Sequence, residues 1–360
     1  METADMSLDS LFNIQHPILL APMAGATTAE LVGAVSEAGG LGGLGAAALT
    51  PERLRRQIHA IRQQTDKPFN VNLFSPVVQD FDPAARPGPA ALALIEQYSR
   101  ELGVTKPPVL ESQYPDPGEQ LAVLIDERVP IISFHFGVEP HHVKAIHDAG
   151  LKVLCSATTV EEARHLDAMG VDAIIAQGSE AGGHRGTFIG DFRQALIGTL
   201  ALVPQVVDAV TVPVIAAGGI MDARGIVACR ALGAAGVQMG TAFLGCPESG
   251  IPRVWQEQLV RSSADSTGVT TAMSGRPARG LRNRYIEEME SLEEPLLPYP
   301  LQYALSASIR RAAAEQDNPA FPAMWAGQGV GLLQIQSAKA LMDQIIRESR
   351  DLAGQLADAR

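Results

Sequence analysis

The sequence predicts an α/β fold: a closed (β/α)8 TIM barrel with a smaller, mostly helical lid or substrate domain inserted near the C-terminus. Eight short apolar runs bounded by Gly and Pro alternate with amphipathic stretches of helical length, as expected for parallel strands joined by crossover helices. Gly39, Gly150, Gly170 and Gly233 follow four of these stretches, where a helix ends in a left-handed turn that suits glycine. Eight such units favour a closed barrel over an open doubly wound sheet.

The elements follow one another along the chain as strand and helix in turn. The expected strands are His16–Ala21, Leu41–Ala46, Phe69–Phe74, Pro130–Phe134, Leu151–Cys155, Ala173–Ala176, Val212–Ala216 and Gly236–Met239. The expected helices between them are Ala29–Ala38, Pro51–Gln64, Glu119–Glu127, Pro140–Ala149, Val160–Met169, Phe192–Ala209 and Ala223–Leu232. Thr159 and Asp222 immediately precede two of these helices and are residue types that cap helix N-termini.

Two segments do not follow this alternation. Residues 75–113 are rich in Pro and contain a helical stretch near Ala90–Arg100, so we expect an insertion between the third and fourth strands. Residues 246–330 carry a dense mixture of Arg, Glu and Pro, which we interpret as the smaller domain. We therefore expect a barrel over residues 1–245 and a C-terminal helix over residues 331–360 that returns to it.

Composition and charge exclude several classes of protein. The 360 residues are 46% hydrophobic and 19% charged, which is typical of a globular chain. The formal net charge of −12 is opposite in sign to the footprint of a nucleic-acid binder, so we expect no nucleic-acid partner. The longest apolar stretch, Leu196–Met221, is broken by Pro204, Asp208 and Pro213, and we expect no membrane span.

Three scattered cysteines suggest reduced thiols. The acidic N-terminal residues do not resemble a signal peptide, so we expect a cytoplasmic protein.

In such a barrel the functional residues lie in the loops that follow the strands. Polar or glycine-rich residues occur at six of the expected strand ends: residues 21–27 (APMAGAT), 70–72 (NVN), 135–137 (HFG), 177–186 (QGSEAGGHRG), 217–220 (AGGI) and 238–241 (QMGT). The last two loops bring Gly218, Gly219, Gly240 and Thr241 to neighbouring strand ends, where free backbone amides bind phosphate in barrels of this class. The alternative is that these glycines only make tight turns.

His184 is the expected catalytic base, because it is the one group titrating near neutrality in a loop of four glycines. His135, which follows an apolar strand, is assigned a substrate-orienting role. His141, His142, His147 and His165 fall on expected helices and are expected to face solvent. None of the histidines and carboxylates shows the spacing of a zinc or iron site, so we expect no metal.

Other polar residues allow two interpretations each. Glu180 is more consistent with capping a backbone amide than with acid or base chemistry. Asn72 and Gln177 have amide groups suited to the imide edge of a flavin ring. Tyr299 and Tyr303 are four residues apart and either orient the substrate or pack the lid on the barrel. Arg276, Arg279 and Arg282 either cover an anionic ligand or serve a solvated or domain-bridging role.

The chain resembles the nitronate monooxygenases, the 2-nitropropane dioxygenase-like flavoproteins, in the class that carries a catalytic histidine. The stretches that carry the resemblance are APMAG (21–25), DKPFNVNLF (66–74), SFHFG (133–137), QGSEAGGHRG (177–186), PVIAAGGI (213–220) and GVQMGTAFL (236–244), with weaker similarity in MSGRPARGL (273–281) and MWAGQG (324–329).

The resemblance implies FMN as the cofactor and alkyl nitronate and O2 as the small-molecule partners, with a carbonyl compound and nitrite as products. It implies that His184 removes the α-proton of a neutral nitroalkane or lies beside an anionic nitronate. The cofactor-binding candidates are Ala21, Pro22, Met23, Asn72, Gln177, Gly182, Gly183, Gly218, Gly219, Gln238, Met239, Gly240 and Thr241. Family members often carry a lysine four residues after the second tyrosine of the lid, where this chain has Ala307.

Several alternatives stay open on the sequence. An FMN-dependent enoyl-acyl-carrier-protein reductase and an NAD(P)H:quinone reductase share the scaffold, and a sugar-phosphate barrel enzyme would use the same phosphate loops. No lysine lies at the strand ends, which disfavours Schiff-base chemistry. The sequence fixes neither the physiological nitronate nor the oligomeric state, for which a homodimer is one candidate.

Overall fold

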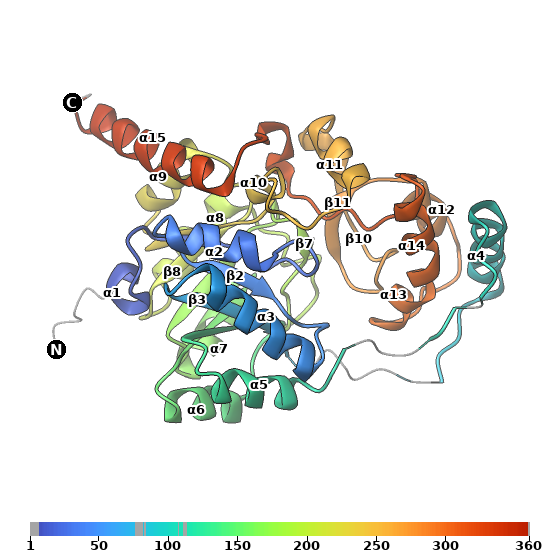
Figure 1. Cartoon of the computed structure of the whole chain (residues 1–360), viewed down its shortest axis with the longest axis horizontal. Coiled ribbons are helices and arrows are strands. Elements are labelled where there is room, and N and C mark those ends of the chain that lie inside the picture. Colours follow the sequence, from blue (N-terminus) through green and yellow to red (C-terminus); the bar gives the residue numbers. More distant parts are fainter. Residues whose placement is uncertain (1–6, 76–81, 83, 107, 111–113, 359–360) are drawn as a thin grey trace.

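The computed structural model describes residues 7–75, 82, 84–106, 108–110 and 114–358. Its main body is a barrel of eight parallel strands surrounded by helices (Figure 1). The strands pair in the order β1-β9-β8-β6-β5-β4-β3-β2. The barrel closes between β1 and β2, the two ends of this order. There the amide of Leu20 donates to the carbonyl of Leu41, which directly precedes β2, at 2.9 Å. The predicted barrel is confirmed.

All eight expected strands are present. They are β1 (Ile18–Leu20), β2 (Gly42–Gly45), β3 (Phe69–Phe74), β4 (Ile131–His135), β5 (Lys152–Ala157), β6 (Ala173–Gln177), β8 (Val214–Ala217) and β9 (Gly236–Met239). Most of their residues are buried on both faces, which is why these strands appear in the sequence as continuous apolar runs rather than as alternating ones.

The crossover helices also lie where the sequence predicts them. They are α2 (Ala29–Glu37), α3 (Pro51–Gln64), α5 (Pro117–Asp126), α6 (Pro140–Asp148), α7 (Val160–Ala168), α8 (Thr199–Val207) and α9 (Ala223–Ala231). The expected start of α8 at Phe192 is wrong. The segment before Thr199 is irregular because the carbonyl of Ala195 accepts a hydrogen bond from Arg185 and Gly198 caps the helix.

Three of the four histidines expected to face solvent are exposed: His141, His147 and His165. His142 is buried, and its ring stacks on Phe134 with the ring centroids 5.7 Å apart. That expectation is wrong for His142.

A second hydrophobic cluster lies beside the barrel (Figure 1). It is built mainly from α4 (Pro89–Leu102), α12 (Arg284–Glu290), α13 (Leu301–Leu305) and α14 (Ala307–Glu315), and we call it the helical cluster. Tyr98 of α4 packs on Phe321 with ring centroids 4.9 Å apart, so the insertion and the later segment share one core. Residues 76–81, 83, 107 and 111–113 of the predicted insertion lie outside the described residues. The boundaries at 245 and 330 stay predictions.

The remaining elements connect the barrel to this cluster and to the ends of the chain. They are α1 (Leu8–Phe12), β7 (Gly183–His184), α10 (Thr241–Leu244), α11 (Arg253–Val260), η2 (Ala264–Ser266), β10 (Thr267–Thr270), β11 (Ala278–Leu281), η3 (Gln328–Leu332) and α15 (Ala338–Asp358). The last helix was expected from Gly331, but a 3₁₀ turn occupies 328–332 and α15 begins at Ala338. It packs on α9 and α2 of the barrel. Within the described residues, no helix has the length and hydropathy needed to cross a bilayer.

Candidate active site

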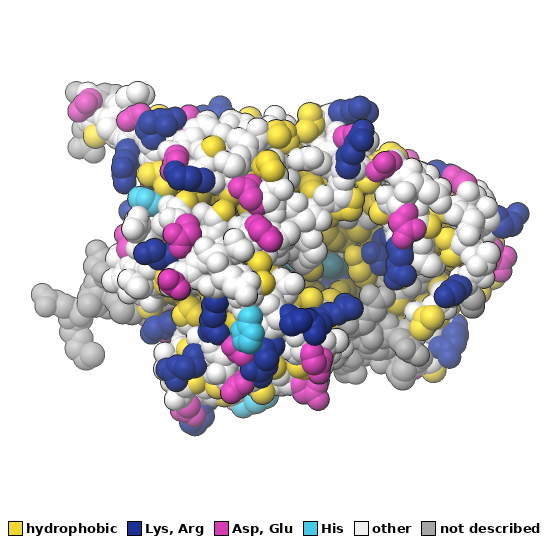
Figure 2. All heavy atoms as spheres, viewed as in Figure 1, with side chains coloured by type: hydrophobic (Ala, Val, Ile, Leu, Met, Phe, Trp, Pro, Cys, Tyr) yellow, Lys and Arg dark blue, Asp and Glu magenta, His cyan; other side chains and the backbone are white. Residues whose placement is uncertain are grey.

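The candidate site lies at the carboxyl ends of the barrel strands, where the barrel meets the helical cluster. Figure 2 shows a hollow between the two, with hydrophobic side chains around it and a histidine on its floor. This end of a parallel barrel carries the functional loops. The structure places the predicted site residues after β1, β3, β4, β6, β8 and β9 at this end.

A small antiparallel sheet, in the order β10-β11-β7, fixes the loop that carries His184. His184 pairs with Ala278 and Gly183 pairs with Arg279. Strand β7 was not predicted from the sequence, because two residues that include a glycine show no strand periodicity. The pairing ties the histidine loop of the barrel to a strand from the segment 246–330.

Buried polar side chains hold the same loop from the barrel side. The Gln177 side chain donates to the carbonyl of His184 at 3.0 Å and accepts from the amide of Gly186 at 2.8 Å. The guanidinium of Arg185 is fully buried and donates to the carbonyls of Gln177, Gly178 and Ala195. Both the NH2 group and the carbonyl oxygen of the Gln177 side chain are therefore hydrogen-bonded within the protein.

Two carboxylates complete these anchors. Glu180 accepts from the backbone amide and the hydroxyl of Thr199 at 2.8–3.0 Å, so the expected capping role is confirmed. Glu162 of α7 is fully buried and accepts from the amides of Phe188 and Ile189 and from Thr158. Sequence reasoning missed Glu162, since a glutamate in the first turn of a helix normally faces solvent.

His184 lies among aromatic rings. Its ring centroid is 5.4 Å from that of Trp325, 5.5 Å from Tyr299, 6.0 Å from Phe136 and 6.3 Å from Phe74. Its Nε2 lies 3.0 Å from Ser274 Oγ. Desolvation, followed by the charges of His135 and Arg276, lowers the pKa of His184 to about 3. The imidazole is therefore neutral across the physiological pH range.

His135 is held by two hydrogen bonds within the protein. Its Nδ1 lies 2.6 Å from Ser156 Oγ and its Nε2 lies 3.1 Å from the carbonyl of His184. Because a carbonyl only accepts, Nε2 carries the proton and Nδ1 accepts from the serine hydroxyl. Burial lowers the pKa of His135 to about 4. The structure thus places His135 behind the histidine loop, in contact with the backbone of His184.

The two tyrosines lie at different distances from His184. Tyr299 is 7% exposed and meets His184 edge to face. Tyr303 lies under the guanidinium of Arg310, whose Cζ is 3.4 Å from the ring centroid. Burial raises the pKa of Tyr299 well above its ordinary value, so its phenol stays protonated and can donate a hydrogen bond. Tyr299 is the one of the pair that reaches the histidine.

The expected cofactor residues surround one end of the barrel. Gly218 and Gly219 have φ of +118° and +71°, a conformation that favours glycine. Within the described chain, the amides of Gly219 and Gly240 donate no hydrogen bond to the protein. A Cβ on Gly240 would lie 3.3 Å from Ala21 Cβ and Met23 Sδ. Gln238 Oε1 is buried without a partner.

Other cofactor candidates are used by the protein itself. Asn72 Nδ2 donates to Ser133 Oγ at 3.0 Å, and the amide of Ala21 donates to the carbonyl of Met239. The side chain of Met239 is fully buried in the core. A Cβ on Gly182 would lie 2.6 Å from backbone atoms of Ala326 and Gly327, so this glycine is required by packing. Gly183 has φ +76°, and a Cβ added to it would meet no atom within 4 Å.

The arginines of the segment 276–282 separate into two kinds. Arg276 and Arg279 turn inward and bond to the carbonyls of Thr187 and Ser179, at 2.7 and 2.9 Å. Arg282 is exposed and pairs with Glu290 at 2.8 Å. Trp325 and Ser274 were not predicted as site residues, because they reach His184 only through the tertiary path of the later segment.

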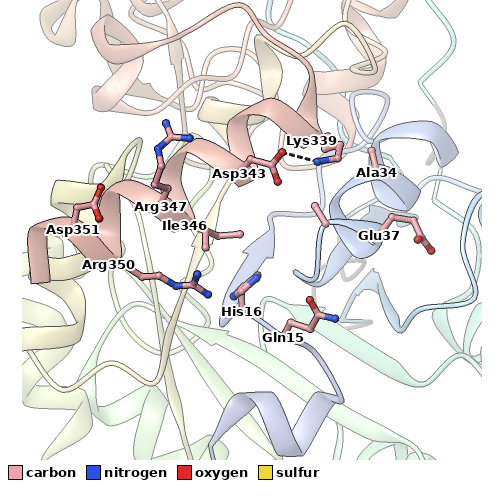
Figure 3. A pocket seen from close by; sticks show the side chains of 11 residues that line it. Gln15, His16, Ala34, Glu37, Lys339, Asp343, Ile346, Arg347, Arg350 and Asp351 are labelled. Atoms are coloured by element: carbon pink, nitrogen blue, oxygen red, sulfur yellow. Dashed lines mark hydrogen bonds and ion pairs between the residues drawn. The ribbon is translucent and has the colours of Figure 1, made fainter. Parts of the chain in front are cut away.

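A cavity of about 880 Å³ lies away from these loops, between α2, α15 and residues 15–16 (Figure 3). Arg350 extends toward His16 there, and Lys339 pairs with Asp343 at 2.6 Å. His16 precedes β1, so this cavity lies at the amino ends of the strands, which carry stability rather than chemistry in such barrels.

Comparisons with known proteins agree with this picture. A family model described as nitronate monooxygenase matches residues 6–348. A probable nitronate monooxygenase of Staphylococcus saprophyticus is 39% identical over 95% of this chain and 97% of its own length. A probable nitronate monooxygenase of Staphylococcus aureus strain MRSA252 is 40% identical over 95% of this chain and 96% of its own length.

Solved structures give the same result. The nitroalkane oxidase of Streptomyces ansochromogenes superposes with a TM-score of 0.84 at 38% identity, covering 95% of this chain and 98% of that one. FabK of Thermotoga maritima superposes with a TM-score of 0.78 at 33% identity, covering 99% and 100%.

Proposed function

The chain belongs to the nitronate monooxygenase family, and from this premise we propose that it is an FMN-dependent enzyme that oxidises alkyl nitronates. The reaction uses O2, with propionate 3-nitronate as an example of the substrate and a carbonyl compound and nitrite as products. One observation carries the proposal: a neutral imidazole, His184, faces an aromatic site at the carboxyl ends of the strands. Its similarity to the solved nitroalkane oxidase and FabK supports an oxidoreductase.

The residues at the carboxyl ends of β8 and β9 fit FMN. Free amides at Gly219 and Gly240 suit a phosphate, and the unpartnered Gln238 Oε1 suits a donor on the ring system. Gly240 keeps the space next to Met23 clear. When bound, FMN supplies the electron acceptor for the nitronate and the means of passing those electrons to O2.

The hydrogen bonds define which nitrogen of His184 accepts a proton. Ser274 Oγ lies 2.9 Å from the carbonyl of Arg276, which can only accept, so the single hydroxyl proton points there. Ser274 Oγ must then accept from His184 Nε2–H. Nδ1 of His184, which has no partner among the described residues, is left as the basic atom.

The low pKa of His184 bears on the choice of substrate. A base with a pKa of about 3 abstracts an α-proton weakly, because efficient bases have a pKa near the working pH. A preformed nitronate needs no such step. We therefore propose that the enzyme prefers nitronates to neutral nitroalkanes.

Oxygen uptake by the purified FMN-loaded protein tests the proposal. Uptake with propionate 3-nitronate, with release of nitrite, is the expected result. Oxidation of NADH with a crotonyl thioester and no oxygen uptake would instead favour an enoyl reductase. A protein that purifies colourless and does not bind added FMN would favour a sugar-phosphate enzyme. A His184→Asn variant should keep the flavin and lose most turnover of a neutral nitroalkane, with a smaller loss for a nitronate.

A further inference from the structure

Arg276 holds a positive charge beside the site without a direct ion pair to a carboxylate. Among the described residues, its one side-chain hydrogen bond runs from Nη2 to the carbonyl of Thr187 at 2.7 Å. Its Nε is buried without a partner. None of the ion pairs among the described residues includes Arg276. A guanidinium carries five N–H donors, so most of the donors of Arg276 are unused.

Neither Glu162 nor Glu180 forms an ion pair with Arg276. Glu162 favours its charge through space, but its oxygens are bonded to Phe188, Ile189 and Thr158. Glu180 is bonded to Thr199. Burial lowers the pKa of Arg276, which reflects the cost of keeping this charge away from water. An anion that arrives with the substrate would remove that cost.

The neighbours of Arg276 place it on the substrate side. Its Cζ lies 4.0 Å from the ring centroid of Phe136, and the same ring meets His184 edge to face at 6.0 Å. Arg276 and His184 therefore both contact the ring of Phe136.

The phosphate position is elsewhere in the barrel. Phe136 follows β4, whereas Gly219 and Gly240 follow β8 and β9, and β5 and β6 separate β4 from β8 in the sheet. Arg276 is therefore across the barrel from the free amides, and a cofactor phosphate held by them would not neutralise it.

We propose that Arg276 is a specificity-determining residue that binds a planar two-oxygen anion of the substrate. This rests on the proposed function. Both the nitronate group and a carboxylate at the far end of the substrate have this shape, and Arg binds such groups through two parallel hydrogen bonds. Nη1 and the second hydrogen of Nη2, which lie side by side at the end of the guanidinium, supply the donors.

Binding of nitrate, a planar unreactive anion, tests this without turnover. Titration calorimetry at fixed ionic strength compares the FMN-loaded wild type with Arg276→Met, Arg276→Lys and the control Arg282→Met. Arg276→Met should weaken nitrate binding about 10- to 100-fold, and Arg276→Lys by an intermediate factor because lysine lacks the planar pair of donors. Arg282→Met should bind as the wild type does, since Arg282 is exposed and paired with Glu290.

Three substrates identify the anion. If Arg276 binds the carboxylate, Arg276→Met raises the KM of propionate 3-nitronate and leaves that of ethylnitronate unchanged. If it binds the nitronate oxygens, both KM values rise. In either case the KM of neutral nitroethane changes less than about threefold.

Unchanged nitrate affinity in Arg276→Met would overturn the proposal. So would an equal loss for all three substrates with nitrate binding intact, because that pattern indicates a structural role. If no nitronate is oxidised by the wild type but nitrate binding still depends on Arg276, the proposed function fails and the anion receptor stands.

Discussion

His184 Nε2 and Ser274 Oγ lie 3.0 Å apart although 90 residues separate them in the chain. The contact joins the loop after β6 to the segment that leads into β11. It also selects the tautomer, because the serine hydroxyl donates to the carbonyl of Arg276 and leaves only its lone pairs for the histidine. A positioning residue thus determines which imidazole nitrogen faces the reaction.

Ser274→Ala should lower kcat for neutral nitroalkanes about 10-fold, because His184 then adopts either tautomer and loses the partner that stabilises its protonated form. Oxygen uptake at pH 7 gives kcat. Nitrogen-15 NMR of the imidazole gives the tautomer, which should change from Nε2–H alone to a mixture.

Ser291→Ala is the control, since Ser291 is exposed and bonds only within its own helix end. A merely structural role for Ser274 would lower kcat without changing the tautomer of His184. That result would contradict the tautomer assignment.

Replacing Glu162 tests the anchor behind the loop. Glu162→Ala removes the acceptor for the amides of Phe188 and Ile189 and should cost about 3 kcal/mol or more in the free energy of unfolding, since buried amides left unpaired are expensive. Glu161→Ala, at an exposed position of the same helix, should change it by less than about 0.5 kcal/mol. Urea unfolding of both variants measures the difference, and equal values would show that Glu162 is not an anchor.

The buried histidines predict acid sensitivity. The pKa of His135 is lowered by burial to about 4 from its ordinary 6.5, so the unfolded chain takes up this proton more readily than the folded one. The contribution to stability is fully present above pH 6.5 and is lost as the pH falls toward 4. Between pH 7 and pH 5 the loss from His135 amounts to about 2 kcal/mol.

Urea unfolding of His135→Gln at the two pH values checks this. The variant should lose less stability on acidification than the wild type, whatever its stability at pH 7. His141→Gln, at an exposed position on α6, should lose as much unfolding free energy between pH 7 and pH 5 as the wild type. If His135→Gln also loses as much as the wild type, His135 is not the source of the acid sensitivity.

The barrel could be predicted from the sequence because its strands and helices are set by local periodicity. His184 and the glycines at 218–219 could also be placed, since strand ends in a barrel converge at one edge. Ser274, Trp325 and Glu162 could not. Their roles depend on where the segment after residue 246 and helix α7 pack against the histidine loop, and contacts between distant segments leave no local pattern.

The same reasoning explains the misplaced boundaries. Residues 192–198 show the apolar pattern of a helix. However, the carbonyl of Ala195 accepts a hydrogen bond from Arg185, and the amide of Thr199 donates one to Glu180. These tertiary hydrogen bonds compete with the helical ones and delay the start of α8. Asn72 and Gln177 likewise looked free in the sequence, whereas Ser133 and the histidine loop occupy them.

Gly182 provides a last test, of how the segment 326–328 closes over the site. The amide of Gln328 donates to the carbonyl of Glu180 at 2.9 Å, and that of Gly327 donates to Thr241 Oγ1 at the same distance. A Cβ on Gly182 would meet the backbone of Ala326 and Gly327 at 2.6 Å, and backbone atoms cannot rotate away. Gly182→Ala should therefore push this segment outward and move Trp325 away from His184. It should lower the free energy of unfolding by about 1–3 kcal/mol.

Gly354→Ala is the matched control. Gly354 lies exposed in α15 with nothing within 4 Å of an added Cβ, and alanine should stabilise that helix by up to about 1 kcal/mol. Thermal unfolding and tryptophan fluorescence of the two variants measure both effects. If Gly182→Ala keeps the wild-type fluorescence and stability, the close approach of 326–327 to the loop does not hold in solution.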